Sequence, residues 1–343
     1  MSNSLSRRAV VAGSLALGAL AGPLASVARS GRAAPLQAVL DYARGQKTTG
    51  FLVIQDRKTL VEENWPAPAV EPLFGNFVYE KTSAGALLED VASQQKSFVS
   101  MLVAIAVDKG LLDVSRPVSD YIGSGWSKAA RDQEARIRVI DVLTMSSGLK
   151  TDFAYQAPPG TVFLYNTPVY AATKLMLAAA ARQPLENITR DWLTVPADMS
   201  DTSWRKRPAA FADVGNPTGL VTSPRDTANF GQIVLDKGRA ANGNQVVSEA
   251  QLNAMFSRSA TNPAYGRLWW LNGSAYTIKP LDTRVDGPLV PAAPADLVAA
   301  LGALDRKLYI VPSRKLLVVR MGAAAPDKDF DQQLWVRLAA ALA

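Results

Sequence analysis

The pattern of apolar and polar residues predicts strands near both ends of the chain and helices in its middle. The stretch FLVIQDRKTLVEENW (51–65) contains two β-rich runs around a charged turn, which indicates a hairpin. Residues 94–109 form a long apolar segment of helix formers that ends at Gly110, as expected for a buried helix with a glycine cap. The same reasoning predicts further helices at 136–146, 168–182, 224–237, 248–257 and 332–343, and strands at 266–273, 307–313 and 315–322.

This order of elements predicts an α+β fold. Early and late strands would form one antiparallel sheet flanked by terminal helices, and an inserted, mostly helical lobe would complete the molecule. We expect the α/β lobe to comprise residues 34–90 and 258–343, and the helical lobe to comprise residues 91–257. A cleft between two such lobes is a common place for an active site.

The composition narrows the chemistry that is open to the chain. Its 343 residues include no cysteine and no histidine, which excludes disulfides, thiolate nucleophiles, Ser-His-Asp triads and the usual zinc ligands. An enzyme with a side-chain nucleophile would therefore need Lys, Tyr, Asp or Glu as its base. The net charge of +7 is modest, and no basic block is interleaved with aromatic residues, so nucleic acid is not an expected partner.

Residues 1–33 have the pattern of a signal peptide. Arg7 and Arg8 precede AVVAGSLALGALAG (9–22), and small residues follow at two possible cleavage sites, near Ala28 and near Ala34. The arginine pair before a mild apolar stretch favours the twin-arginine route, with a general secretory signal or an uncleaved anchor as alternatives. We expect an exported protein, periplasmic or extracellular, with no stable membrane span after signal removal.

The pattern Ser-x-x-Lys occurs three times, as Ser93–Lys96, Ser147–Lys150 and Ser203–Lys206. Only the first copy lies at the start of a predicted buried helix, where residues three apart share one face. Burial would depress the pKa of the lysine, and its neutral amine could accept the serine proton. An ordinary helix N-cap explains Ser93 about equally well, so these residues leave both interpretations open.

The chain resembles the penicillin-binding, β-lactamase-fold serine hydrolases. This family includes class C β-lactamases, DD-peptidases, esterases and amidases such as 6-aminohexanoate-oligomer hydrolases. The resemblance runs in order over nearly the whole chain after the signal segment and is carried by stretches such as DVASQQKSFVSMLVAIAVDKGLLD (90–113), VIDVLTMSSGL (139–149), PPGTVFLYNTPVY (158–170) and LYIVPSRKLLVVRMG (308–322). It implies a β-lactamase/transpeptidase-like fold and an acyl-enzyme mechanism.

Carried onto this sequence, the resemblance implies Ser93 as the nucleophile and Lys96 as its lysine partner. The family's second motif, Tyr-x-Asn, matches Tyr165, which would act as base or acid once Lys96 lowers its pKa. Tyr170 is the alternative tyrosine. Thr167 occupies the position of the motif asparagine, and Asn166, shifted by one residue, is a possible hydrogen-bond donor to substrate.

The family's third motif, Lys-Thr-Gly or His-x-Gly on a strand, corresponds to Ala300-Leu301-Gly302. The cation that holds a substrate carboxylate is thus missing, and Arg306 and Lys307 lie nearby, either as substitutes or as a polar turn. The resemblance implies an oxyanion hole from the backbone N–H groups of Ser93 and Ala303, with Gly302 allowing close approach of substrate.

Two consecutive tryptophans, Trp269 and Trp270, are candidates for an acyl pocket. Neighbouring strand residues point to opposite faces, so at most one of them is expected there, and Trp269 is assigned to it.

The sequence thus predicts an exported serine hydrolase that cleaves ester or amide bonds through an acyl-enzyme on Ser93, without metal or cofactor. Its substrate would be a small ester or amide, or a cell-wall-derived compound. The alternatives are a DD-peptidase or β-lactamase-type penicillin-binding protein, and a catalytically silent relative that only binds such fragments.

Overall fold

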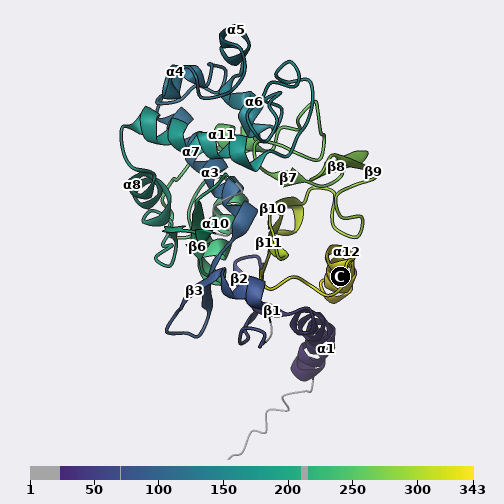
Figure 1. The fold of residues 1–343 in the computed structure, drawn as a ribbon. Coiled ribbons are helices and arrows are strands. Elements are labelled where there is room, and N and C mark those ends of the chain that lie inside the picture. Colours follow the sequence, from purple (N-terminus) through teal and green to yellow (C-terminus); the bar gives the residue numbers. More distant parts are fainter. Residues whose placement is uncertain (1–23, 70, 210–214) are drawn as a thin grey trace, which may run out of the picture.

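A computed structural model describes residues 24–69, 71–209 and 215–343 (Figure 1). Most of the predicted signal peptide, residues 1–33, lies outside the described residues. Helix α1 (Leu24–Gly45) begins within that segment and leads into the first strand of the main sheet.

Six antiparallel strands form the main sheet in the order β2-β1-β12-β11-β10-β7. They are β1 (Thr48–Gln55), β2 (Lys58–Asn64), β7 (Trp270–Leu271), β10 (Val298–Gly302), β11 (Arg306–Val311) and β12 (Leu316–Gly322). Strand β1 pairs with β12, so the two ends of the chain meet in the sheet as the sequence predicts. Helices α1 and α12 (Phe330–Ala341) pack together, and α10 (Pro224–Leu235) packs against β1, β11 and β12.

The middle of the chain is mostly helical. Its longer helices are α3 (Gln95–Asp108), α7 (Thr167–Ala181) and α11 (Glu249–Met255), and the short ones are α4 (Ser119–Ile122), α5 (Arg131–Glu134), α6 (Val139–Leu143), α8 (Leu185–Thr189) and the π-helix η2 (Arg190–Thr194). Helix α3 is buried from Gln95 to Ile105 and beyond, because it packs against α7, α11 and β10. The helices predicted around α3, α7, α10 and α11 are confirmed, whereas α6 is shorter than the predicted 136–146.

A second sheet was not predicted. Its four short strands, in the order β3-β4-β6-β5, are β3 (Val78–Lys81), β4 (Leu87–Asp90), β5 (Ser203–Lys206) and β6 (Thr218–Thr222). Strand β4 continues directly into the 3₁₀ turn η1 (Ala92–Gln94) and then into α3. The remaining elements are α2 (Pro72–Gly75), the hairpin β8 (Tyr276–Lys279) and β9 (Thr283–Asp286), and η3 (Pro312–Arg314).

The strand predicted at 266–273 is reduced to the two residues of β7. Leu268 adopts a left-handed conformation with φ of 61°, which interrupts an extended strand. Beyond this interruption, β7 pairs with β10 through Trp270 and Leu271. The interruption leaves Trp269 and Trp270 in different surroundings, as described below.

Candidate active site

Ser93 lies in the 3₁₀ turn between β4 and α3. Ala92 precedes it with φ of 50°, a left-handed conformation that costs energy for a residue with a Cβ. The carboxylate of Asp90 supports this turn, because its Oδ1 accepts a hydrogen bond from Ala92 N–H at 2.8 Å. Ser93 is half-buried while Ala92 and Gln94 are buried, so the turn presents the serine to the surface.

Lys96 points back toward Ser93 from the first turn of α3. Its Nζ lies 3.0 Å from Ser93 Oγ and 3.2 Å from Thr167 Oγ1. The rings of Tyr165 and Tyr170 enclose the amine at 4.9 and 4.7 Å from their centroids. Burial, with a smaller contribution from the charge of Arg207, lowers the pKa of Lys96 to about 7. A substantial fraction of the amine is therefore neutral at neutral pH, as a base for Ser93 requires.

Tyr165 lies beside the same serine and shares a hydrogen bond with it. Burial raises the pKa of Tyr165 to about 12, although its bond to Ser93 acts in the opposite direction. The expectation that Lys96 lowers the pKa of this tyrosine is thus wrong. A protonated phenol that faces Ser93 can donate a proton but cannot serve as a base near neutral pH.

Tyr170, the alternative tyrosine, is fully buried. Its hydroxyl is 3.5 Å from Gln95 Oε1, and burial raises its pKa well above the usual value. Its ring forms a wall beside Lys96. The geometry therefore places Tyr165, and not Tyr170, in contact with the serine.

The contacts of Asn166 and Thr167 differ from those expected from the sequence. Asn166 is the N-cap of α7: its Oδ1 accepts from Val169 N–H at 3.1 Å, and its Nδ2 donates to the carbonyl of Leu149 at 2.9 Å. Because both ends of this buried amide are engaged within the protein, we no longer assign it to substrate binding. Thr167, one residue further, points at Lys96 instead.

The end of β10 lies against the turn that carries Ser93. A Cβ at Gly302 would collide with the carbonyl oxygen of Val91 and lie 3.3 Å from Gln94 N. Only glycine allows the strand to approach this closely. Ala303, the next residue, is exposed in the turn to β11. This arrangement brings the backbone of Gly302 to the turn that carries Ser93, and an oxyanion hole from the N–H groups of Ser93 and Ala303 stays a prediction.

The position of the missing cation is occupied by a methyl group. Ala300 is fully buried and, two residues from Gly302, points to the same face of β10. Arg306 and Lys307 do not replace the cation, and they are not a solvated turn. Arg306 Nη2 is 2.9 Å from Glu89 Oε2 in a fully buried pair, and Lys307 Nζ is 3.0 Å from Asp331 Oδ1.

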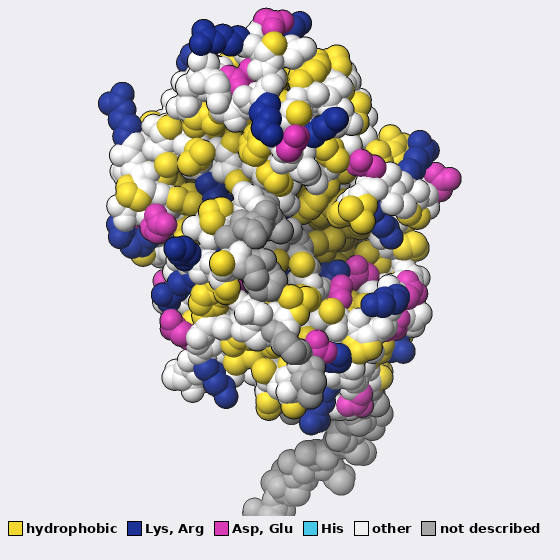
Figure 2. Space-filling model, viewed as in Figure 1, with side chains coloured by type: hydrophobic (Ala, Val, Ile, Leu, Met, Phe, Trp, Pro, Cys, Tyr) yellow, Lys and Arg dark blue, Asp and Glu magenta, His cyan; other side chains and the backbone are white. Residues whose placement is uncertain are grey.

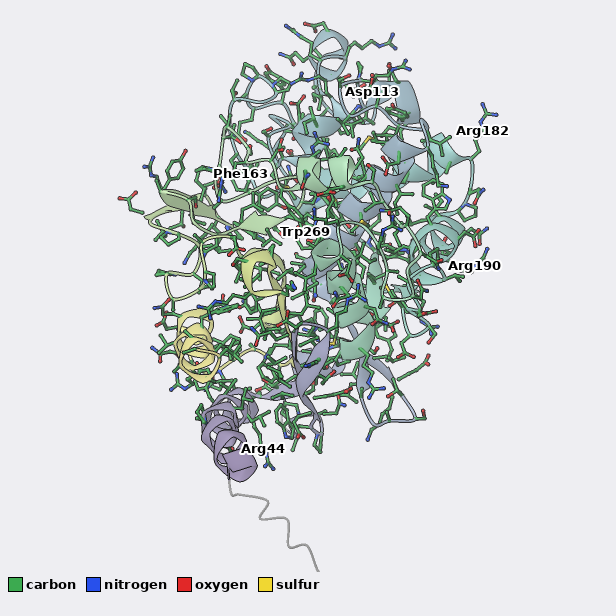
Figure 3. All side chains as sticks on the ribbon, turned by 180° about the vertical axis from the view of Figure 1, so that it is seen from behind. Arg44, Asp113, Phe163, Arg182, Arg190 and Trp269 are labelled. Carbon is green, nitrogen blue, oxygen red and sulfur yellow. The ribbon has the colours of Figure 1, made fainter. Side chains whose placement is uncertain are left out.

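Trp270, rather than Trp269, borders the candidate catalytic residues. Its ring stacks on Tyr165 with a centroid distance of 5.8 Å and an interplanar angle of 24°. Trp269 is fully buried and packs between Phe230 and Phe256. Figure 3 shows Trp269 within the body of the molecule. The assignment of Trp269 to the substrate pocket is therefore wrong. Figure 2 shows a hollow with apolar side chains in the region where Figure 1 places β7 and β10.

The two other Ser-x-x-Lys copies lack this geometry. Lys150 is exposed, and Ser147 accepts only a local bond from Leu149 N–H at 3.3 Å. Ser203 and Lys206 lie on β5, where Lys206 is exposed. Among the described residues, no group of three or more acidic side chains is placed to hold a metal ion, and no helix is long and apolar enough to cross a membrane.

Solved structures with the same architecture are named as beta-lactamases, a carboxypeptidase and a hydrolase. A class C beta-lactamase superposes with a TM-score of 0.66 at 15% identity, covering 93% of this chain and 98% of its own. A beta-lactamase/D-alanine carboxypeptidase from Yersinia pestis has a TM-score of 0.63 at 16% identity, covering 89% and 97%. A structure described as a 6-aminohexanoate-dimer hydrolase from Bacillus anthracis has a TM-score of 0.65 at 16% identity, covering 90% and 82%.

At such low identity these structures establish the fold alone, which is the β-lactamase fold. The sequence profile of the Beta-lactamase family matches residues 46–342. The chain therefore belongs to the Beta-lactamase family. Among curated proteins, no sequence matches this chain significantly.

Proposed function

We propose that the protein is an exported serine hydrolase that cleaves ester or amide bonds through an acyl-enzyme on Ser93. The observation that carries this proposal is the 3.0 Å separation of Lys96 Nζ and Ser93 Oγ. A buried amine with a pKa of about 7, in contact with a half-exposed hydroxyl, is a base paired with a nucleophile. Burial of Lys96, with a smaller contribution from the charge of Arg207, supports a base that needs no histidine.

The proposed reaction has two stages. Lys96 takes the proton of Ser93 as its oxygen attacks the carbonyl carbon, and the backbone N–H groups of Ser93 and Ala303 stabilise the oxyanion. Tyr165 then donates its proton to the leaving alcohol or amine and recovers a proton from Lys96, so the acyl-enzyme forms with no net proton change. Water attacks the acyl-enzyme with the same groups acting in reverse, which releases the acid and frees Ser93.

We infer that the acyl part of the substrate is uncharged near the third motif. A lysine or histidine at position 300 would place a cation on the face of β10 that meets the serine turn, and Ala300 supplies none. Arg306 and Lys307 are held by carboxylates. Trp270 adds an apolar surface beside Tyr165. Small esters or amides without a carboxylate at this position fit such a site better than D-Ala-D-Ala ends.

A DD-peptidase or β-lactamase activity is the second candidate. It is supported by the solved structures, since two of the three described above are named as beta-lactamases and one of these also as a D-alanine carboxypeptidase. A silent relative that only binds cell-wall fragments is the third. The contact between Lys96 and Ser93 argues against a catalytically silent protein, because binding alone does not require a base beside a serine.

One experiment separates these candidates. The purified chain and its Ser93→Ala variant are incubated with a fluorophosphonate probe, short p-nitrophenyl esters and a set of β-lactams, with Ser203→Ala as a control for the copy of the motif on β5. We expect labelling and ester hydrolysis in the parent and in Ser203→Ala, and neither in Ser93→Ala. Hydrolysis that survives Ser93→Ala contradicts the nucleophile, β-lactam turnover contradicts the substrate class, and no labelling favours the binding relative.

A further inference from the structure

The strand that leads to Ser93 is held by two buried ion pairs, one on each side. Glu89 and Asp90, the last residues of β4, point to opposite faces of the strand. Glu89 pairs with Arg306 of β11, and Asp90 pairs with Arg207, which follows β5. Removing one partner of a buried pair leaves an uncompensated charge, so such pairs fix the position of the backbone that carries them.

The pair of Asp90 and Arg207 is bidentate. Arg207 Nε lies 2.7 Å from Asp90 Oδ2, and its Nη2 lies 2.9 Å from Oδ1. The side chains are 2% exposed for Asp90 and 7% exposed for Arg207, so water does not screen them. Gly219 of β6 leaves the space for the carboxylate, since a Cβ there would collide with it.

The same carboxylate reaches the turn of the nucleophile. Asp90 Oδ1, which accepts from Arg207, also accepts from the N–H of Ala92, the residue with a left-handed backbone immediately before Ser93. Arg207 is fixed in turn, because its Nη1 donates to the carbonyl of Asn216 at 3.1 Å. A continuous chain of bonds thus joins the segment after β5 to the turn that presents the serine.

The positive charge of Arg207 also acts on Lys96. Burial is the larger cause of the lowered pKa of Lys96, and the charge of Arg207 adds to it. The ionisable groups that face this region are Tyr165, Tyr170 and Lys174 on the side of α7, Asp90 on β4, and Arg207. Of these, only Asp90 carries a carboxylate, and it is bound by Arg207.

We propose that Asp90 and Arg207 are positioning residues of the active site: Asp90, clamped by Arg207, holds the strained turn at Ala92 that presents Ser93. This inference rests on the proposed serine hydrolase function. The arrangement makes two opposite predictions. Loss of the Arg207 charge favours protonation of Lys96, and loss of the Asp90 charge disfavours it.

The test uses the full-length chain and three variants. Arg207→Gln removes the charge and keeps a donor, Arg207→Lys keeps the charge and loses the bidentate contact, and Asp90→Asn removes the negative charge but keeps an acceptor for Ala92 N–H. The midpoint of the acidic limb of kcat/KM is measured with a p-nitrophenyl ester. The titration midpoint of Lys96 itself is followed by NMR of ¹³C-labelled lysine, and Lys96→Met identifies its signal. This measurement works even if the protein has no turnover.

We expect Arg207→Gln to move both midpoints up by about 0.5 to 1 pH unit, Arg207→Lys to leave them within about 0.2, and Asp90→Asn to move them down. All three variants should lower kcat about tenfold or more, because each loses the bidentate ion pair that fixes the side chain of residue 90 under the turn at Ala92. Arg306→Gln, which breaks the matching pair of Glu89, is the control for loss of a buried arginine and should move neither midpoint.

The outcomes separate the two claims. An unchanged kcat in Asp90→Asn and Arg207→Gln overturns the positioning role. Equal midpoints in Arg207→Gln and Arg207→Lys, or a shift of the same sign in Arg207→Gln and Asp90→Asn, overturn the effect of the Arg207 charge on Lys96. If Arg207→Gln does not fold, a downward shift of both midpoints in Asp90→Asn supports the effect of these charges on Lys96, and no shift contradicts it. If the fluorophosphonate probe does not label Ser93 in the parent chain, the proposed hydrolase function is wrong. The Lys96 midpoints measured by NMR still test the role of Asp90 and Arg207 in that case.

Discussion

Thr167 Oγ1 lies 3.2 Å from Lys96 Nζ, at the position where the related motif carries an asparagine. The amine is thus held between two hydroxyls, those of Ser93 and Thr167. A hydroxyl both accepts and donates, so it can hold Lys96 in its protonated and its neutral form. Asn166, displaced by one residue, caps α7 and fixes where that helix begins. The change of motif therefore preserves a polar contact to the lysine with a different side chain.

Replacing Thr167 should reduce activity through Lys96 rather than through the fold. Thr167→Val keeps the shape and removes the hydroxyl, so we expect kcat to fall by about 5- to 20-fold, the value of one hydrogen bond to a partly charged group. Thr167→Asn restores an acceptor and should retain more activity than Thr167→Val. Steady-state kinetics with one p-nitrophenyl ester measure both. Equal losses in the two variants would show that the hydroxyl has no such role.

The pH dependence should report the titration of Lys96. Its pKa is lowered to about 7, and only the neutral amine accepts the serine proton, so the acylation rate should fall about tenfold per pH unit below that value. The rate should reach a plateau above it, because Tyr165 keeps its proton up to about pH 12. Pre-steady-state acylation between pH 5 and pH 9 tests this. An acylation rate that is independent of pH in that range would contradict the assignment of Lys96 as the base.

Tyr165→Phe tests the tyrosine as a proton donor. The ring and its stacking on Trp270 remain, whereas the hydroxyl beside Ser93 is lost. We expect kcat to fall about 100-fold or more with alkyl esters, whose leaving alcohols need a proton, and much less with p-nitrophenyl esters, whose phenolate leaves unaided. Tyr170→Phe is the matched control, and it should change the ratio of the kcat values for the two esters little. An equal loss on both esters would contradict the assignment.

The fold was largely predictable because the strongest patterns in the sequence belong to buried elements. The strands β1, β11 and β12 and the helix α3 are apolar over most of their length, and the structure contains all of them. The second sheet escaped prediction, because its strands have four or five residues and several of their side chains are charged. Strands this short are stabilised by pairing between distant segments, which a local pattern does not show.

Within the active site, the sequence predicted the residues that have a motif and missed those that act through tertiary contacts. Ser93 and Lys96 share one turn of helix, so their spacing places them together. Asp90 and Arg207 are 117 residues apart, and no spacing signals their pairing. The choice between Trp269 and Trp270 depended on the left-handed Leu268, which a strand pattern cannot reveal.

Trp269 and Trp270 should therefore differ in their mutational effects. Trp269→Leu is expected to lower the free energy of unfolding by about 2–4 kcal/mol, because it leaves a cavity between Phe230 and Phe256, and to leave KM nearly unchanged. Trp270→Leu should lower kcat/KM for esters about tenfold or more by releasing the ring of Tyr165. Urea unfolding and kinetics on both variants measure these effects. A larger loss of kcat/KM in Trp269→Leu than in Trp270→Leu would instead indicate that Trp269 lines the substrate site.

Lys174 of α7 should make the stability of the protein depend on pH. Its amine donates to Asn216 Oδ1 at 2.7 Å and to Thr218 O at 3.0 Å, and burial lowers its pKa to about 6. Between that value and about 10.4, the unfolded chain binds a proton on this lysine that the folded chain does not. The free energy of unfolding should therefore rise with pH in this window, by up to about 1.4 kcal/mol per pH unit.

Lys174→Met removes the titrating group and keeps most of the apolar stem. We expect the variant to lose part of the stability that the contacts to Asn216 and Thr218 supply, and to show a smaller rise in unfolding free energy between pH 7 and pH 9 than the parent. Lys96 retains its own contribution in both proteins, since its pKa is also lowered. Guanidinium unfolding at several pH values gives both slopes. Identical slopes in parent and variant would mean that Lys174 stays protonated in the folded protein, held as an ammonium ion by its three acceptors.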